Sequence, residues 1–442
     1  GFQTVAEAQQ LSHFQLARYL DAADLALGAA IERAGKPAKP FKKFCIPAEL
    51  SRAGGGNYRG PELRDGLSIS WPITLQFFGR MPVTAVPQDG WYRVTLQQVR
   101  AVNPPPGGSV WGTLRSGTGQ SSAPMLYMIG LVEATAEPKD MVYEAWIQKG
   151  HLLELKPNDG TLKRAPTGAT GGNVSFKGRD LTRDGFSGIA HEGIHIERIH
   201  PVADQETVRR RLFGEHGLEK LKADPQSGLK EVVSRFAGRA FRRPVTAEQI
   251  EPYLQLGRAA LKETGDIRDA VRASYRAILC SPRFLTLIES PGDLDDHAVA
   301  SRLSYALWVS MPDERLLELA AAGKLRQPAV LAAEVKRMLK DPKSERFIRS
   351  FTDQWLKLAQ IDFTAPDTRQ FNDFDSVLQE SMVQETRAYV RELIQENLSV
   401  THLVDSDFAF LNDRLARHYM LEVTLKPGAG LQKVSLKPDS VR

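Results

Sequence analysis

The residues that first suggest chemistry are His191, Glu192 and His195, which match the pattern H-E-x-x-H. In zinc proteases this pattern lies on a helix, where the two imidazoles bind one zinc ion and the glutamate activates water. Here the neighbouring glycines and the alternation of Ile194 with Ile196 predict a strand instead. On a strand, residues four apart are separated by about 13 Å and cannot share a metal ion. We therefore interpret the match as accidental.

A second candidate lies on the same expected strand. His195 and Glu197 are two residues apart, so both point to one face of a strand. An imidazole and a carboxylate are ordinary metal ligands. These two residues are therefore the candidate ligands of a metal site different from a protease zinc site.

Tryptophans in the strand-rich part of the sequence offer a different chemistry. A pyranose face presents C–H groups that can stack on an aromatic ring. The same side chains can instead form the core of a β-sandwich, and a carbohydrate site needs only two of them to be exposed. The candidates are Trp71, Trp91, Trp111 and Trp146.

Paired carboxylates are a further candidate, because a glycosidase uses one as acid and one as base or nucleophile. Asp295 and Asp313 each precede a helical pattern, where a carboxylate accepts hydrogen bonds from the first free amides. Capping therefore accounts for both. Asp405 and Asp407 flank a serine in a short loop, where a turn role suffices. No catalytic residue is assigned from the sequence.

Period-two alternation predicts the strands that carry these candidates. Tyr92, Val94 and Leu96 alternate with polar residues, which places the apolar set on one face of a sheet. Similar runs recur between about residues 60 and 200 and are separated by turn residues, which predicts an antiparallel β-sandwich or jelly roll. The other runs are 67–78, 110–114, 125–132, 141–147, 152–155 and 194–199.

Helical patterns lie on both sides of this strand region. Residues 4–34 carry an apolar stripe, residues 246–249 form a capping box, and residues 374–393 predict a long helix. The expected fold class is α+β, with an all-helical scaffold domain and an antiparallel β-sandwich module. The expected domains are 1–59 (N-terminal helical module and linker), 60–202 (carbohydrate-binding-like β-sandwich), 203–290 (helical module) and 291–442 (second helical module).

Length and composition limit the functions to consider. The 442 residues suggest about three folding units, and 42% apolar with 25% charged residues excludes disordered and collagen-like chains. The net charge of +5 is spread thinly and the short basic runs lack interleaved aromatics, so no nucleic-acid binding is expected. No stretch approaches the ~20 apolar residues of a membrane span. The start at Gly1, without a methionine or signal peptide, suggests an excised piece.

The two cysteines, Cys45 and Cys280, are too far apart in sequence for any CxxC element. This excludes zinc ribbons, iron–sulfur ligation by cysteines and covalent c-type haem attachment within this chain. The two can pair across domains in an oxidising compartment or remain isolated thiols, and we favour two isolated buried thiols.

Short motifs recur in order along both helical parts of the sequence. They are Leu11-Ser12, Tyr19-Leu20, Ala22–Asp24, Phe236–Thr246 (FAGRAFRRPVT), Ile278–Leu285 (ILCSPRFL), Arg302–Trp308 (RLSYALW), Met311–Asp313, Gly323–Leu325, Gln354–Leu356 and Phe410–Asn412. This series resembles the large secreted multidomain proteins of planctomycetes and their relatives, which are built of domains of unknown function. Those proteins also carry c-type cytochrome segments.

The resemblance implies an expected function. The chain would be the exported, polysaccharide-binding scaffold part of a haem-associated protein. It would act in the periplasm or outside the cell. The one cofactor expected on this chain is a calcium ion on the sandwich. Haem c would belong to an adjoining segment or to a partner cytochrome c domain or subunit, and would support electron transfer there. The alternative is an enzyme acting on glycans, hydrolytic or redox, with a site between the strand and helical domains. Whether the chain is an enzyme stays open at this point.

Overall fold

The chain divides into two compact units, one formed by residues 1–39 and 202–347 and the other by residues 40–201 and 348–442. This division groups the expected segments differently, because the first helix joins residues 202–347 while the C-terminal part joins the strand region. The computed structural model describes residues 12–35, 40–51, 60–73, 79–105, 108–119, 125–164, 179–200, 203–289, 291–361, 363, 366–367, 370–371 and 373–436.

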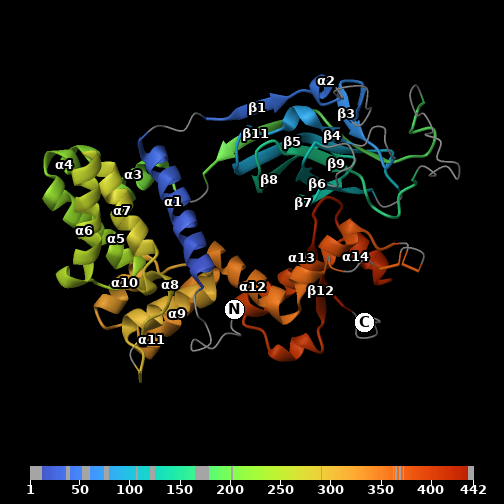
Figure 1. The fold of residues 1–442 in the computed structure, drawn as a ribbon. Coiled ribbons are helices and arrows are strands. Elements are labelled where there is room, and N and C mark those ends of the chain that lie inside the picture. Colours follow the sequence, from blue (N-terminus) through green and yellow to red (C-terminus); the bar gives the residue numbers. More distant parts are fainter. Residues whose placement is uncertain are drawn as a thin grey trace. The chain divides into compact units, whose positions relative to one another are not determined.

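Helices build the first unit (Figure 1). One apolar core joins α1, α5, α6 and α7, and a second core forms around Trp308. The expected caps are present, since the Thr246 hydroxyl and Gln249 amide form a capping box and Asp295 and Asp313 each accept an amide hydrogen bond. The elements are α1 (His13–Gly35), α3 (Gln205–Phe213), α4 (Gly217–Ala223), α5 (Pro225–Ala240), α6 (Ala247–Thr264), α7 (Ile267–Leu279), α8 (Pro282–Leu285), α9 (Asp296–Trp308), α10 (Glu314–Ala321), α11 (Pro328–Lys340) and η4 (Pro342–Ser344).

Two antiparallel sheets form the centre of the second unit (Figure 1). The larger sheet has the order β1-β11-β5-β10-β3-β2, with β8 also paired to β5, and the smaller has the order β4-β9-β6-β7. Val94, Leu114 and Ile194 lie in one shared core, so the two sheets pack through their apolar faces. The strands are β1 (Lys42–Cys45), β2 (Glu62–Arg64), β3 (Leu67–Ser70), β4 (Arg80–Met81), β5 (Gly90–Val102), β6 (Val110–Gly117), β7 (Tyr127–Ala134), β8 (Lys139–Ile147), β9 (Leu152–Lys156), β10 (Gly188–His191) and β11 (Gly193–Ile199).

The α+β class is confirmed, but the expectation of an all-helical remainder is wrong. After residue 203 the described chain also contains β12 (Phe408–Leu411) and β13 (Gln432–Ser435), which pair antiparallel. Phe408 is buried and stacks on Tyr389 with ring centroids 4.9 Å apart, so tertiary packing selects the strand. The other elements are α2 (Pro47–Leu50), η3 (Pro82–Thr84), α12 (Glu345–Trp355), η5 (Leu358–Gln360), α13 (Ser376–Gln395), η6 (Val400–Leu403) and α14 (Asp413–His418).

Buried polar contacts attach α13 and α14 to the sandwich within the second unit. The Arg414 guanidinium is 2% exposed and lies 2.8 Å from Asp375 and 3.4 Å from Asp159, which are also buried. Trp111 on β6 donates its indole hydrogen to Asp413, the first residue of α14, at 2.5 Å. The C-terminal part of the chain therefore completes the sandwich surface near β6. No helix in the described part of the chain is long and apolar enough to cross a membrane.

Candidate functional site

The outer face of β1, β11, β5 and β8 is the candidate site. On β5, Tyr92, Val94 and Leu96 point into the core and are fully buried, so the intervening residues point outward. The same alternation on β8 and β11 exposes Trp146 and His195. The alternation along each strand therefore determines which side chains point to solvent on this face and can contact a ligand.

Strand register arranges these outward side chains in three rows across the sheet. Directly opposed residues on antiparallel strands lie on one face with their Cβ atoms about 5 Å apart. The first row is Phe44, His195, Thr95 and Val142; the second is Lys42, Glu197, Arg93 and Glu144; the third is Ile199, Trp91 and Trp146.

Trp91 and Trp146 form the aromatic part of this face. They are directly opposed on β5 and β8, and their rings meet edge to face with centroids 6.4 Å apart and an interplanar angle of 79°. Trp91 is 41% exposed and Trp146 is 53% exposed. In such a pair the ring that contributes its edge keeps its own face free for another partner. The pair can therefore stack against a sugar ring.

The neighbouring row supplies hydrogen-bonding groups whose charges are compensated. Arg93 donates from Nε and Nη2 to one oxygen of Glu144, at 3.0 and 2.7 Å. Lys42 lies 2.8 Å from Glu197. Exposed pairs of this kind contribute little stability, but they hold polar groups at fixed positions beside the tryptophans. The result is an aromatic platform next to a polar row with no surplus charge.

The structure buries the other two tryptophan candidates. Trp71 is 0% and Trp111 is 2% exposed, so neither ring offers a face to a sugar. Their indole N–H groups are also engaged, with Glu62 at 2.7 Å and with Asp413 respectively. Both side chains lie in the interior, where residues of other elements contact them.

The H-E-x-x-H match lies on strands, as expected from its glycines and isoleucines. His191 ends β10 and His195 lies on β11, with Gly193 between them at a φ of 154°. Burial lowers the pKa of the fully buried His191 to about 4, and its Nδ1 lies 3.3 Å from the carbonyl oxygen of Gly193. His195 is exposed on the outer face. The two imidazoles therefore do not form a helical zinc site.

The metal candidates His195 and Glu197 share the outer face of β11, as expected. Each already has a partner, since the His195 ring stacks on Phe44 with centroids 4.3 Å apart and Glu197 pairs with Lys42. Among the described residues, no group of three or more His, Cys, Asp or Glu side chains is placed to hold a metal ion. A metal at this pair, like a calcium ion on the sandwich, stays a prediction.

Both cysteines are free thiols. Cys45 is buried at the end of β1, and burial raises its pKa. Cys280 follows α7 and is partly buried, and burial is again the main cause of its raised pKa. A raised pKa disfavours the thiolate, so neither cysteine has the character of a nucleophile.

Sequence reasoning missed several residues of this face. Phe44 and Lys42 lie on β1, in a segment expected to be a linker, because four residues give too short an alternation to recognise. The pairing of Arg93 with Glu144 depends on strand register, which the sequence does not reveal. The outward direction of Trp91 was available from the sequence, since it has the same parity as Arg93.

Comparison with protein families identifies two segments of the helical regions. Residues 229–289 match the model PSD5, described as a protein of unknown function (DUF1595), and residues 294–421 match PSD4, described as a protein of unknown function (DUF1592). No curated protein matches the chain. The expectation of domains of unknown function is confirmed. Neither matched segment includes the strands that carry the outer face.

Proposed function

We propose that the chain binds polysaccharide on the outer face of the larger sheet, with Trp91 and Trp146 as the stacking side chains. The observation that carries this proposal is the direct opposition of two exposed tryptophans on β5 and β8. A tryptophan pair left open to solvent on a sheet face is apolar surface that a ligand can cover. The ligand it fits best is a ring with C–H groups on its face and hydroxyls at its edge.

The second row defines how such a ligand would be held. A sugar ring stacked on Trp146 places its hydroxyl groups toward Arg93 and Glu144, which lie one row away on the same two strands. The Arg93 guanidinium donates and the Glu144 carboxylate accepts, so both kinds of hydroxyl interaction are available. Because the two charges compensate each other, this face favours neutral glycans over strongly anionic ones.

The cellular setting is part of the same proposal. The motif series supports an exported protein, periplasmic or extracellular, with a jelly-roll sandwich and a cytochrome c domain or subunit as its partner. Cys45 and Cys280 cannot form the CxxCH element that attaches haem c, so the haem would be bound outside this chain. The proposed role of the chain is to hold polysaccharide near that partner.

A glycan array followed by titration tests this function. The array identifies a binding oligosaccharide, and calorimetry then compares the wild type with Trp146→Ala and Trp91→Ala. Each variant should bind about tenfold more weakly or worse, equivalent to about 1.4 kcal/mol. The matched control is Trp355→Ala. Trp355 is 49% exposed, which lies between the values of Trp91 and Trp146, and its ring centroid lies 5.3 Å from that of Phe351.

Two results would contradict the proposal. One is the absence of any glycan that binds saturably. The other is a bound glycan whose affinity is unchanged in both sheet variants or falls equally in the Trp355 control. Product analysis on the bound glycan separates binding from turnover and so tests the alternative of an enzyme.

A further inference from the structure

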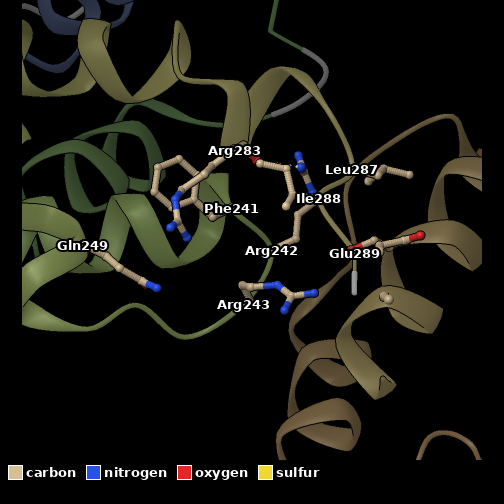
Figure 2. Close-up of a pocket in the computed structure, with 10 residues that line it drawn as sticks. Phe241, Arg242, Arg243, Gln249, Arg283, Leu287, Ile288 and Glu289 are labelled. Carbon is tan, nitrogen blue, oxygen red and sulfur yellow. Dashed lines mark hydrogen bonds between the residues drawn. The ribbon is translucent and has the colours of Figure 1, made fainter. Parts of the chain in front are cut away.

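A cavity of about 230 Å³ lies within the helical unit, and all of its lining residues belong to that unit. It is bordered by the end of α5, the first turns of α6 and α9, and α8 with the segment after it. Figure 2 shows the labelled side chains around this space, and the adjacent Arg242 and Arg243 leave the backbone in different directions. Three of its lining residues are arginines, which is the feature that requires an explanation: Arg242, Arg243 and Arg283.

Arg242 is buried, yet no carboxylate among the described residues compensates its charge. It donates hydrogen bonds to the carbonyl oxygens of Arg283, Phe284 and Thr286 at 3.0, 3.1 and 2.9 Å. Its remaining partner is Tyr305, whose hydroxyl lies 3.5 Å away and whose ring centroid lies 5.7 Å away. These partners are all neutral. A buried cation with only neutral partners raises the electrostatic potential of the cavity it lines.

The backbone at Arg242 shows why the position is unusual. Its φ is 59°, in the left-handed region where glycine is preferred after a helix. The residue is 5% exposed, and its guanidinium joins the end of α5 to the last carbonyls of α8. An arginine in this conformation is sustained by those hydrogen bonds. It fixes the arrangement of its neighbours Arg243 and Arg283 around the cavity.

The cavity also contains donors that a ligand can reach. Arg283 is exposed and forms no ion pair within the described part of the chain. Arg243 forms one ion pair, from Nη1 to Asp295 at 3.2 Å. The oxygen of the Gln249 side chain accepts from Thr246, which leaves its NH₂ group available to donate. Each of these groups donates hydrogen bonds, as an oxyanion requires.

Negative charge on the lining is small by comparison. Of the described residues that line the cavity, Glu289 alone carries a carboxylate, and Arg302 already pairs with it. The first turns of α6 and α9 are already capped by the Thr246 hydroxyl and the Asp295 carboxylate, so the positive charge of the cavity comes from the arginines. Phe241, Leu287 and Ile288 add apolar surface beside the arginines. Surplus positive charge and apolar surface thus meet in one small cavity.

From this arrangement we infer that the cavity binds a small organic carboxylate, with its carboxylate group on the arginines and its apolar body against Phe241 and Ile288. The planar guanidinium groups match the geometry of a carboxylate. The cavity volume limits the ligand to a compact molecule. This inference depends only on the helical unit and is independent of glycan binding by the sheet.

Benzoate is the probe for the test, with benzamide as its neutral isostere and inorganic sulfate as an anion without an apolar body. Titration of the full chain, followed by NMR, should give saturable benzoate binding at least about tenfold tighter than binding of either comparison compound. Arg283→Gln should weaken benzoate binding about tenfold, since the exposed Arg283 can be replaced without disturbing the core. Arg346→Gln is the matched control, because Arg346 is also exposed, forms no ion pair in the described chain and lies outside the cavity.

Benzamide or sulfate binding as tightly as benzoate would overturn the inference. So would an unchanged benzoate affinity in Arg283→Gln, or the absence of saturable benzoate binding to the wild type. Circular dichroism of both variants establishes that they are folded. A loss of glycan binding in the sheet variants leaves this test unaffected, so the two proposals fail separately.

Discussion

Two buried arginines, one in each unit of the chain, differ in the charge of the groups that contact their guanidinium groups. Arg414 in the second unit lies against the carboxylates of Asp375 and Asp159. Arg242 in the helical unit lies against three carbonyl oxygens and a tyrosine. Both side chains are almost completely buried. The first charge is compensated within the protein and the second is not.

This difference separates an architectural role from a binding role. A buried cation paired with two carboxylates holds segments together. Its charge is already neutralised within the protein, so it does not attract an anionic ligand. A buried cation with neutral partners beside an open cavity leaves positive potential for a ligand to neutralise. The sheet face differs from both cases, because its pairs Arg93–Glu144 and Lys42–Glu197 are exposed and compensate their own charges. A ligand on that face would be held by stacking and hydrogen bonds and not by net charge.

The largest expected effect comes from replacing Arg414 with methionine. The substitution keeps much of the volume but leaves Asp159 and Asp375 buried without their cation. Breaking a buried ion pair in this way costs about 3–5 kcal/mol. Urea unfolding at neutral pH should show a loss of that size in the free energy of unfolding of the second unit.

Arg93→Met provides the comparison for this prediction. Arg93 forms a similar pair with Glu144, but both side chains are more than 40% exposed. Its loss should cost no more than about 1 kcal/mol. Equal effects of the two substitutions would show that burial does not decide the role of these arginines.

His191 is a third buried basic group, and it is uncharged at neutral pH. This predicts that the stability of the protein depends on pH. Burial lowers the pKa of His191 to about 4, whereas an unfolded histidine has a pKa of about 6.5. As the pH falls below 6.5 the unfolded chain binds a proton that the native chain does not. Stability should therefore fall between about pH 6.5 and pH 4, by about 3 kcal/mol in total from this residue.

His191→Met should remove that contribution, so the variant should lose correspondingly less stability over the same pH range. An NMR titration of the wild-type imidazole gives an independent check that does not require the variant to fold. A midpoint near 6.5 for His191 would contradict the assignment of a neutral buried histidine.

A smaller effect is expected for Arg242→Met. The variant loses hydrogen bonds to three carbonyls but leaves no buried carboxylate behind. The expected cost is about 1–3 kcal/mol, less than that of Arg414→Met. Thermal unfolding with and without benzoate would sharpen the comparison, because stabilisation by benzoate should be present in the wild type and reduced in the variant.

The sequence predicted the sheet face better than the cavity. The outward set of β5 follows from its alternation with Tyr92, Val94 and Leu96, so the exposure of Trp91 is a local property. Trp111 could not be judged in the same way. Trp111 lies on a strand that is buried on both faces. One residue that contacts it, Asp413, comes about 300 residues later in the chain.

The cavity was not recognisable because its chemistry depends on distant partners. Arg242 and Arg243 belong to a short basic run that resembles a solvated surface. Their role depends on the carbonyls of α8, some 40 residues away, and on Asp295, which caps α9. Local patterns determine which side of an element a residue occupies, but not which charges compensate it.

The position of a bound oligosaccharide tests the central claim most directly. A crystal structure of the chain with the tightest-binding glycan from the array should place a sugar ring in van der Waals contact with the face of Trp146 or Trp91. Its hydroxyl groups should reach Arg93 or Glu144. A glycan bound elsewhere on the chain, with both tryptophans still open to solvent, would contradict the account.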